Sequence, residues 1–155
     1  MLCRATDASP ACPREAVETH VMQEFSIYGP QSARHEYFGF VYQRDGLIDS
    51  AVVRSSECRN PDLCVVNVGA AATRIPSGAT VLGEWHTHPH DGARGLSEPD
   101  VRGAYNNRHI RCYRAYYSNP FGEIYAWSPQ DTSVPTAMNS RVYLGSYLTR
   151  LARVG

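Results

Sequence analysis

The sequence predicts one α/β (α+β) domain in which helices flank a mixed β-sheet. The length of 155 residues fits a single domain. Apolar residues make up 43% of the chain and charged residues 19%, which is enough for a packed core. Segments with strand-like composition alternate with segments of helical periodicity. We therefore expect a domain over residues 13–155, preceded by an irregular arm over residues 1–12.

A helix is expected first, because apolar residues recur at helical spacing from Val17 to Tyr28. Pro13 suits its first turn, and Gly29-Pro30 ends it. The next expected elements are a hairpin of residues 36–43 and 47–53, a short strand over 64–68 and a turn at 76–78.

The second half begins with a strand over residues 80–88, which Pro89 ends. A loop with two glycines follows over 90–96. The remaining expected elements are a short helix from Ser97 to about residue 107, a hairpin of 111–118 and 123–127, and a closing helix within 141–153. Gly145 interrupts the apolar pattern of that last helix.

Charge and hydropathy exclude several classes of partner. Fifteen basic residues, all arginine, balance fifteen acidic ones, which removes the electrostatic argument for binding nucleic acid or an anionic membrane. No apolar run approaches the roughly 18 residues of a transmembrane helix, and the first residues lack the apolar core of a secretory signal. The protein is thus expected either in the cytoplasm or exported without a Sec-type signal, unless the chain is a piece of a longer protein.

Five cysteines leave the redox compartment open. Cys58 and Cys64 flank a turn-like segment, and Cys3 and Cys12 flank another. Disulfides Cys58–Cys64 and Cys3–Cys12, with Cys112 left over, would fit an oxidising compartment. Five reduced thiols in a cytosolic protein are the alternative, because spacing in the sequence does not fix Cα distances.

The motif His86-Thr87-His88 ends the expected strand over 80–88. Residues i and i+2 of a strand point the same way with Cα atoms about 6.5 Å apart, so both imidazoles can converge on one ion. On a helix the same pair would diverge. Taken alone, two histidines before a proline can equally be ordinary residues at the end of a strand.

Ser97-Glu98-Pro99-Asp100 follows after eight residues and resembles a helix start. Ser97 is a good N-cap, and Asp100 falls in the first turn. Alone, Ser-x-x-Asp is a common cap. Together with His86 and His88, however, Asp100 completes three ligands and leaves a fourth position for water, as in catalytic zinc sites. The sequence therefore predicts one catalytic Zn²⁺ ion.

A hydrolytic site also needs a base, and three carboxylates are candidates. Glu84 would lie on the ligand face further down the strand, buried or ion-paired. Glu98 is an early helix residue that suits the helix dipole. Glu36 heads an apolar strand, where a carboxylate is costly without a partner or a task; its alternative is a solvated residue at a strand start.

These residues resemble the JAMM (MPN/JAB-like) zinc metallopeptidases, bacterial JAB-like branch. The resemblance rests on His86-x-His88…Ser97-x-x-Asp100 and on Glu36-Tyr37-Phe38-Gly39-Phe40, similar to the family's Glu-x-x-Gly-apolar segment. It implies Glu36 as general acid/base, His86, His88 and Asp100 as zinc ligands, and Ser97 as oxyanion partner. It also implies a single MPN/JAB-like domain with an architecture like that of cytidine deaminases, although the deaminase signature is absent.

The resemblance implies hydrolysis of an amide or isopeptide bond in a protein or peptide, with a ubiquitin-like conjugate as one option. The alternatives are a secreted bacterial effector or toxin module that uses the same site, and a non-catalytic MPN scaffold. One departure concerns the spacer from Pro89 to Leu96, which has eight residues where the family usually has seven. His90 and Asp91 in that spacer are further polar candidates, ranked below Asp100.

Overall fold

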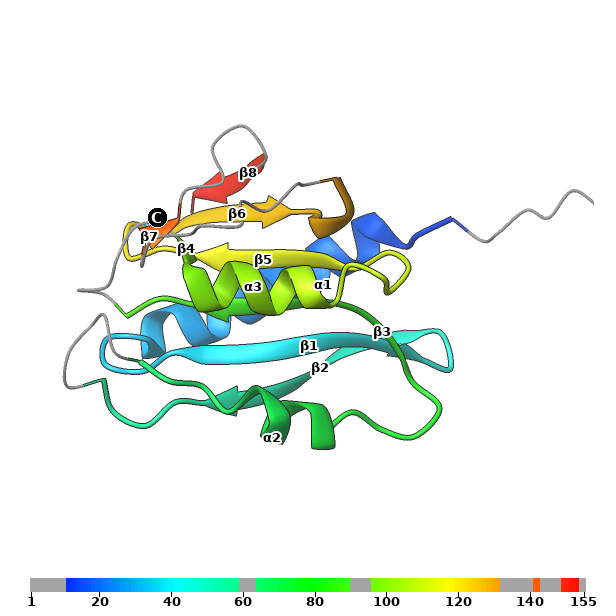
Figure 1. Cartoon of the computed structure of the whole chain (residues 1–155), viewed down its shortest axis with the longest axis horizontal. Helices are drawn as coiled ribbons and strands as arrows, with labels where there is room; N and C mark the ends of the chain where they lie inside the picture. Colours follow the sequence, from blue (N-terminus) through cyan, green and yellow to red (C-terminus); the bar gives the residue numbers. More distant parts are fainter. Residues whose placement is uncertain (1–10, 59–63, 90–95, 132–140, 143–148, 154–155) are drawn as a thin grey trace, which may run out of the picture.

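A six-stranded mixed sheet forms the centre of the molecule, in the order β2-β1-β3-β5-β6-β8 (Figure 1). The computed structural model describes residues 11–58, 64–89, 96–131, 141–142 and 149–153. Neighbouring strands are antiparallel except β3 and β5, which are parallel. The strands of this sheet are β1 (Tyr37–Arg44), β2 (Leu47–Arg54), β3 (Thr80–Thr87), β5 (Arg114–Ser118), β6 (Glu123–Trp127) and β8 (Thr149–Arg153). A second, two-stranded sheet pairs β4 (Leu96–Ser97) with β7 (Arg141–Val142).

Helices cover both faces of the large sheet. In Figure 1, α1 lies behind the sheet, and α2 and α3 lie in front of it. The helices are α1 (Arg14–Tyr28), α2 (Val68–Thr73) and α3 (Glu98–Asn106), with short 3₁₀ turns η1 (Gly29–Gln31) and η3 (Pro129–Asp131). None of the helices in the described ranges is long and apolar enough to cross a membrane. The arrangement confirms the mixed α+β class.

The core follows this layering. On the α1 side, Val21 and Phe25 pack with Trp85 and Tyr116 of the sheet. On the other side, Val101 and Ala104 of α3 pack with Tyr117 and Trp127, and α2 packs with β1 and β2. Each large apolar side chain buried in this way contributes about 1.5–3 kcal/mol. The two packed faces fix β3 and β5 between α1 and α3.

Most of the expected elements are confirmed. The first helix, both hairpins, the strand ending in the His-x-His motif and the helix after Ser97 occur within a few residues of the predicted bounds. Of the expected N-terminal arm, residues 11 and 12 have no regular structure, and residues 1–10 lie outside the described part.

Two element predictions were wrong. Residues 64–67 form no strand, because the Asn67 side chain accepts the N–H of Ala70 at 2.9 Å and starts helix α2 instead. The tail forms no closing helix in its described part. Its residues 141–142 and 149–153 are strands, since the free edges of β4 and β6 offer backbone pairing that helical spacing in the sequence cannot reveal.

The cysteine prediction was half right. Cys58–Cys64 is a disulfide, whereas Cys12 pairs with Cys112 and not with Cys3. The start of α1 lies beside the segment that leads into β5, so the Cα atoms of Cys12 and Cys112 are 5.5 Å apart despite a sequence separation of 100. Cys3 lies outside the described residues.

Gly83 provides a test of the β3–β5 pairing. A Cβ atom at this position would overlap the backbone carbonyl oxygen of Arg114 on β5. We expect Gly83→Ala to lower the free energy of unfolding by about 2–3 kcal/mol, because the two strands must separate to admit the methyl group. Urea denaturation followed by circular dichroism measures this change.

The matched control is Gly103→Ala in α3, where a Cβ would meet nothing within 4 Å. It should raise the free energy of unfolding by about 0.5–1 kcal/mol, since alanine favours the helix. Equal effects of the two substitutions would contradict the close approach of the strands.

Candidate metal centre

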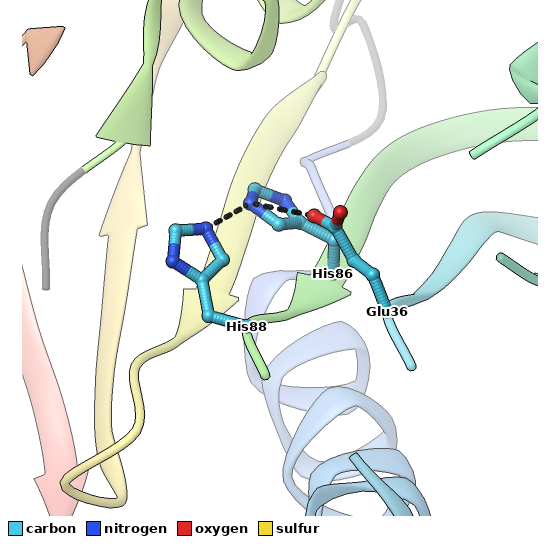
Figure 2. A group of neighbouring side chains, drawn as sticks. All are labelled: Glu36, His86 and His88. Atoms are coloured by element: carbon cyan, nitrogen blue, oxygen red, sulfur yellow. Dashed lines mark hydrogen bonds and ion pairs between the residues drawn. The ribbon is translucent and has the colours of Figure 1, made fainter. Parts of the chain in front are cut away.

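The two histidines of the motif lie at the end of β3 and face α3. His86 pairs in register with Phe38 of β1 on one side and Tyr117 of β5 on the other. His88 follows the strand, and its N–H donates to the Ser118 carbonyl at 3.0 Å. Both side chains are buried, and their Nε2 atoms lie 3.0 Å apart (Figure 2). Extended backbone thus makes the imidazoles converge as expected.

Asp100 joins them from the first turn of α3. Its Oδ2 atom lies 3.5 Å from Nε2 of His86 and 3.7 Å from Nε2 of His88. Zinc–ligand bonds of about 2.0–2.1 Å in a tetrahedron place ligand atoms about 3.3 Å apart. The three distances between these atoms, 3.0, 3.5 and 3.7 Å, bracket that value.

Glu36 approaches from the residue before β1. Its Oε1 atom lies 4.0 Å from Nε2 of His86, and its side chain is only 12% exposed (Figure 2). Ligand atoms of Glu36, His86 and His88 all lie within 4.8 Å of one another, so this buried group could hold a metal ion. Of the two carboxylates, Asp100 lies closer to the imidazoles, while Glu36 stands beside them.

Burial and the close charges shift the pKa values of these side chains. Burial raises the pKa of Glu36 to about 7, even though His86 opposes the shift. Burial alone would lower the pKa of His86, but the carboxylate of Asp100 and then that of Glu36 raise it to about 9. Burial likewise acts to raise the pKa of Asp100, but His86 and His88 hold it well below its usual value. The carboxylates therefore favour a positive charge between the imidazoles.

Ser97 is placed by its backbone alone. It pairs with Arg141 in the small sheet and directly precedes α3, which begins at Glu98. The side chains of Ser97 and Glu98 lie outside the described part of the chain, as do His90 and Asp91 of the spacer. The oxyanion role expected for Ser97 therefore remains a prediction.

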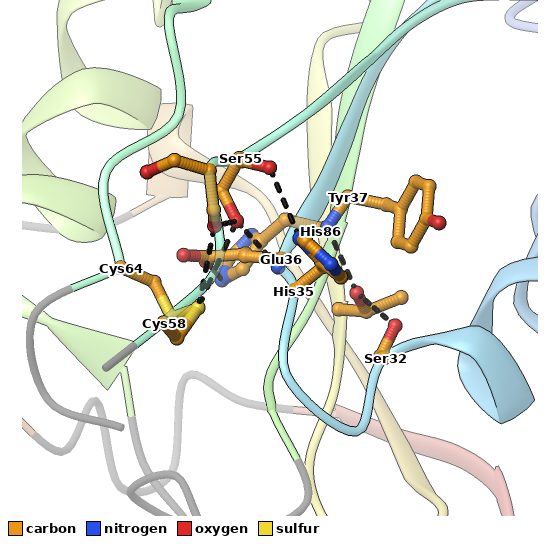
Figure 3. Close-up of a disulfide and its surroundings, with 10 residues drawn as sticks. Ser32, His35, Glu36, Tyr37, Ser55, Cys58, Cys64 and His86 are labelled. Atoms are coloured by element: carbon orange, nitrogen blue, oxygen red, sulfur yellow. Dashed lines mark hydrogen bonds and ion pairs between the residues drawn. A yellow bond between two sulfur atoms is a disulfide. The ribbon is translucent and has the colours of Figure 1, made fainter. Parts of the chain in front are cut away.

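Ser55 is a site residue that the sequence did not indicate. Its N–H donates to the Glu36 carbonyl and its Oγ accepts the Glu36 N–H, both at 2.8 Å (Figure 3). The Sγ atom of Cys58, part of the second disulfide, lies 3.7 Å from the same Oγ. The disulfide loop thus borders the backbone that carries Glu36. No local pattern could have revealed it, because the contact spans 19 residues.

Thr87 provides a second link, on the opposite face of β3. Its Oγ1 accepts the Tyr37 N–H at 3.0 Å and the Ser32 hydroxyl at 2.7 Å, and it is fully buried. The residue between the two histidines therefore fixes the chain position next to Glu36. Tyr117 completes the surroundings, with ring centroids 5.9 Å from His86 and 5.5 Å from His88.

Glu84, the rejected candidate for the base, is buried as expected. The hydroxyl of Tyr113 donates to its Oε1 at 2.5 Å. Burial raises the pKa of Glu84 to about 7, although the Tyr113 hydrogen bond opposes the shift. Its carboxylate is therefore hydrogen-bonded in the core, two residues before His86 on β3.

The raised pKa of Glu84 predicts a pH-dependent stability. The folded state binds this proton more tightly than the unfolded state, so the contribution is fully present below about pH 4.5 and is lost as the pH rises through about 7. Glu84→Gln cannot ionise. In chelated protein we expect the variant to gain about 3 kcal/mol relative to wild type between pH 4.5 and 8.

Urea denaturation at both pH values measures the difference. The exposed Glu57, changed to Gln, is the control and should show no such gain. If Glu84→Gln changes the free energy of unfolding equally at both pH values, the raised pKa of Glu84 is contradicted.

Neither family models nor curated protein sequences give a match to this chain.

Proposed function

We propose that this protein is a zinc-dependent metallopeptidase of the JAMM type, with an MPN/JAB-like fold, that hydrolyses an amide or isopeptide bond. The observation that carries the proposal is the convergence of His86, His88 and Asp100 within 3.0–3.7 Å, next to the buried carboxylate of Glu36. The chain order supports it too, because the residue before β1, the end of β3 with the residue after it, and α3 supply these side chains in the order of the family's motif.

The donor set fits zinc. Two imidazole nitrogens and one carboxylate oxygen are ligands that Zn²⁺ accepts in catalytic sites, which keep one position open. When bound, the ion would lower the pKa of a water molecule towards about 7 and polarise a carbonyl group. Tyr117 packs against both imidazoles and restricts their orientation.

Glu36 is assigned the proton transfer. A general base works best when its pKa lies near the working pH, and burial raises that of Glu36 to about 7. The carboxylate accepts a proton from the attacking water and gives it to the leaving amine. Ser55 and Thr87 hold the backbone at Glu36 and at Tyr37, which keeps the carboxylate at the histidines. Ser97, one residue before α3, is assigned to the developing oxyanion.

The proposed substrate is a protein or peptide, with a ubiquitin-like conjugate as one form. The chain has no net charge that would favour nucleic acid.

An exported effector or toxin module is a second candidate role for the same site. Two disulfides favour it, because such bonds persist in oxidising compartments. One of them borders the backbone of Glu36, so the redox state of the surroundings bears directly on the site.

Metal binding and catalysis can be separated by substitution. We expect one zinc ion per chain, lost in His86→Ala, as measured by elemental analysis after dialysis. Glu36→Gln should keep the zinc and lower cleavage about 10²–10⁴-fold, because it removes only the proton acceptor. A panel of peptides and of isopeptide-linked ubiquitin-like conjugates measures cleavage.

Glu84→Gln is the matched control, since it also removes a buried carboxylate near the histidines. It should retain both zinc and cleavage. Stoichiometric zinc without cleavage of any substrate in the panel would contradict the proposed activity, and loss of cleavage in both variants would contradict the assignment to Glu36.

Thiol mapping tests the exported role. Two disulfides among five cysteines leave one thiol. We therefore expect mass spectrometry after alkylation of the native protein, purified from its source under acid quench, to find one modified cysteine, Cys3. Five modified cysteines would contradict export into an oxidising compartment.

A further inference from the structure

A cavity lies at the other end of the sheet from the candidate metal centre. It has a volume of about 520 Å³ and is bounded by the start of α1 and by the segment that leads into β5. These two segments lie side by side in Figure 1. The metal centre lies where β3 and β5 end, and this cavity lies where β5 begins. The disulfide Cys12–Cys112 joins the two walls covalently. The cavity is therefore part of a cross-linked region and is separate from the proposed catalytic site.

Arg114 lines this cavity and is 92% buried, with a relative exposure of 8%. Its Nη1 donates to Ser128 Oγ at 3.3 Å, whereas its buried Nε makes no hydrogen bond. Arg114 forms an ion pair with Glu18, whose Oε1 lies 3.8 Å from that Nε and 3.6 Å from Nε of Arg14. One carboxylate is thus shared by two guanidinium groups, and the triad keeps one positive charge.

Two more arginines, Arg108 and Arg111, also line the cavity. The chain from residue 101 to 122 contains four arginines and no acidic residue, although the protein as a whole is neutral. A mostly buried guanidinium in the wall of a cavity, together with a surplus of positive charge, is an environment that binds a phosphate group.

Part of the remaining wall is apolar. Val17, Leu82 and Tyr116 line this part, and all three are buried in the core of the α1 side. The volume lies in the range of small-molecule sites. A ligand that fills it needs an apolar part next to its anionic group.

We propose that this cavity binds a small organic phosphate, with the phosphate at Arg114 and the apolar part against Val17, Leu82 and Tyr116. Arg108 and Arg111 add charge at the entrance. The binding site is independent of zinc and of the proposed hydrolysis.

Calorimetric titration tests the proposal, with phenyl phosphate, inorganic phosphate and phenol as probes. The protein is chelated first, because phosphate also binds zinc. We expect phenyl phosphate to bind about tenfold more tightly than inorganic phosphate, since its ring buries apolar surface. Phenol should bind most weakly. Added salt should weaken both phosphates through screening.

Two substitutions with opposite expected effects on the affinity test whether the ligand binds in this cavity. Arg111→Gln should lower the affinity for phenyl phosphate about threefold to tenfold. Glu18→Gln should raise it by a similar factor, because the acid no longer competes for Arg14 and Arg114. The exposed Arg44, outside the cavity, gives a matched control in Arg44→Gln, which should leave the affinity unchanged.

Arg114→Gln should abolish binding, and circular dichroism checks its fold. If that variant does not fold, Arg111→Gln and Glu18→Gln decide the question. The proposal is overturned if phenyl phosphate does not saturate below about 10 mM, if phenol binds as tightly as phenyl phosphate, or if neither variant differs from Arg44→Gln.

Discussion

The parallel pairing of β3 with β5 is the constraint on which the candidate metal centre depends. Parallel neighbours cannot be joined by a tight turn, so the chain must cross over and return to the opposite end of the sheet. Helix α3 makes this crossover, and its first turn lies beside the end of β3. Asp100 reaches the imidazoles of His86 and His88 for this reason, and Gly83 allows the two strands to approach.

The same geometry buries two carboxylates close together, and a cation between them stabilises their charge. Two carboxylates and two imidazoles share a site from which the fold excludes most water, and burial disfavours each charge alone. A positive charge between them, whether a proton or a metal ion, stabilises the ionised form of Asp100. Glu36 lies further from the imidazoles than Asp100, with its Oε1 4.0 Å from Nε2 of His86. Its distance and its raised pKa favour proton transfer over ligation.

Sequence reasoning found the parts of the site that local geometry determines. Alternation on a strand places His86 and His88 together, and the start of α3 at Glu98 places Asp100 in its first turn. It did not find Ser55 or Thr87, whose contacts with the Glu36 region span 19 and 50 residues. The closing helix expected within residues 141–153 was wrong for a similar reason. Residues 149–153 pair with the open edge of β6, and this pairing outweighs their helical spacing. Cys12 paired with Cys112 because the fold, and not the spacing, brings them together.

The two disulfides lie in different parts of the fold, one at the arginine-lined cavity and one near the candidate metal centre. Cys12–Cys112 joins the walls of the arginine-lined cavity, and Cys58–Cys64 adjoins the Ser55 that holds Glu36. A cross-link over a separation of 100 residues restricts the unfolded chain far more than one over 6. The first bond therefore acts chiefly on the stability of the whole fold, whereas the second acts chiefly on the local order beside the metal centre. Reduction of the two bonds would consequently affect the protein in different ways, with the proposed catalytic residue more sensitive to the shorter loop.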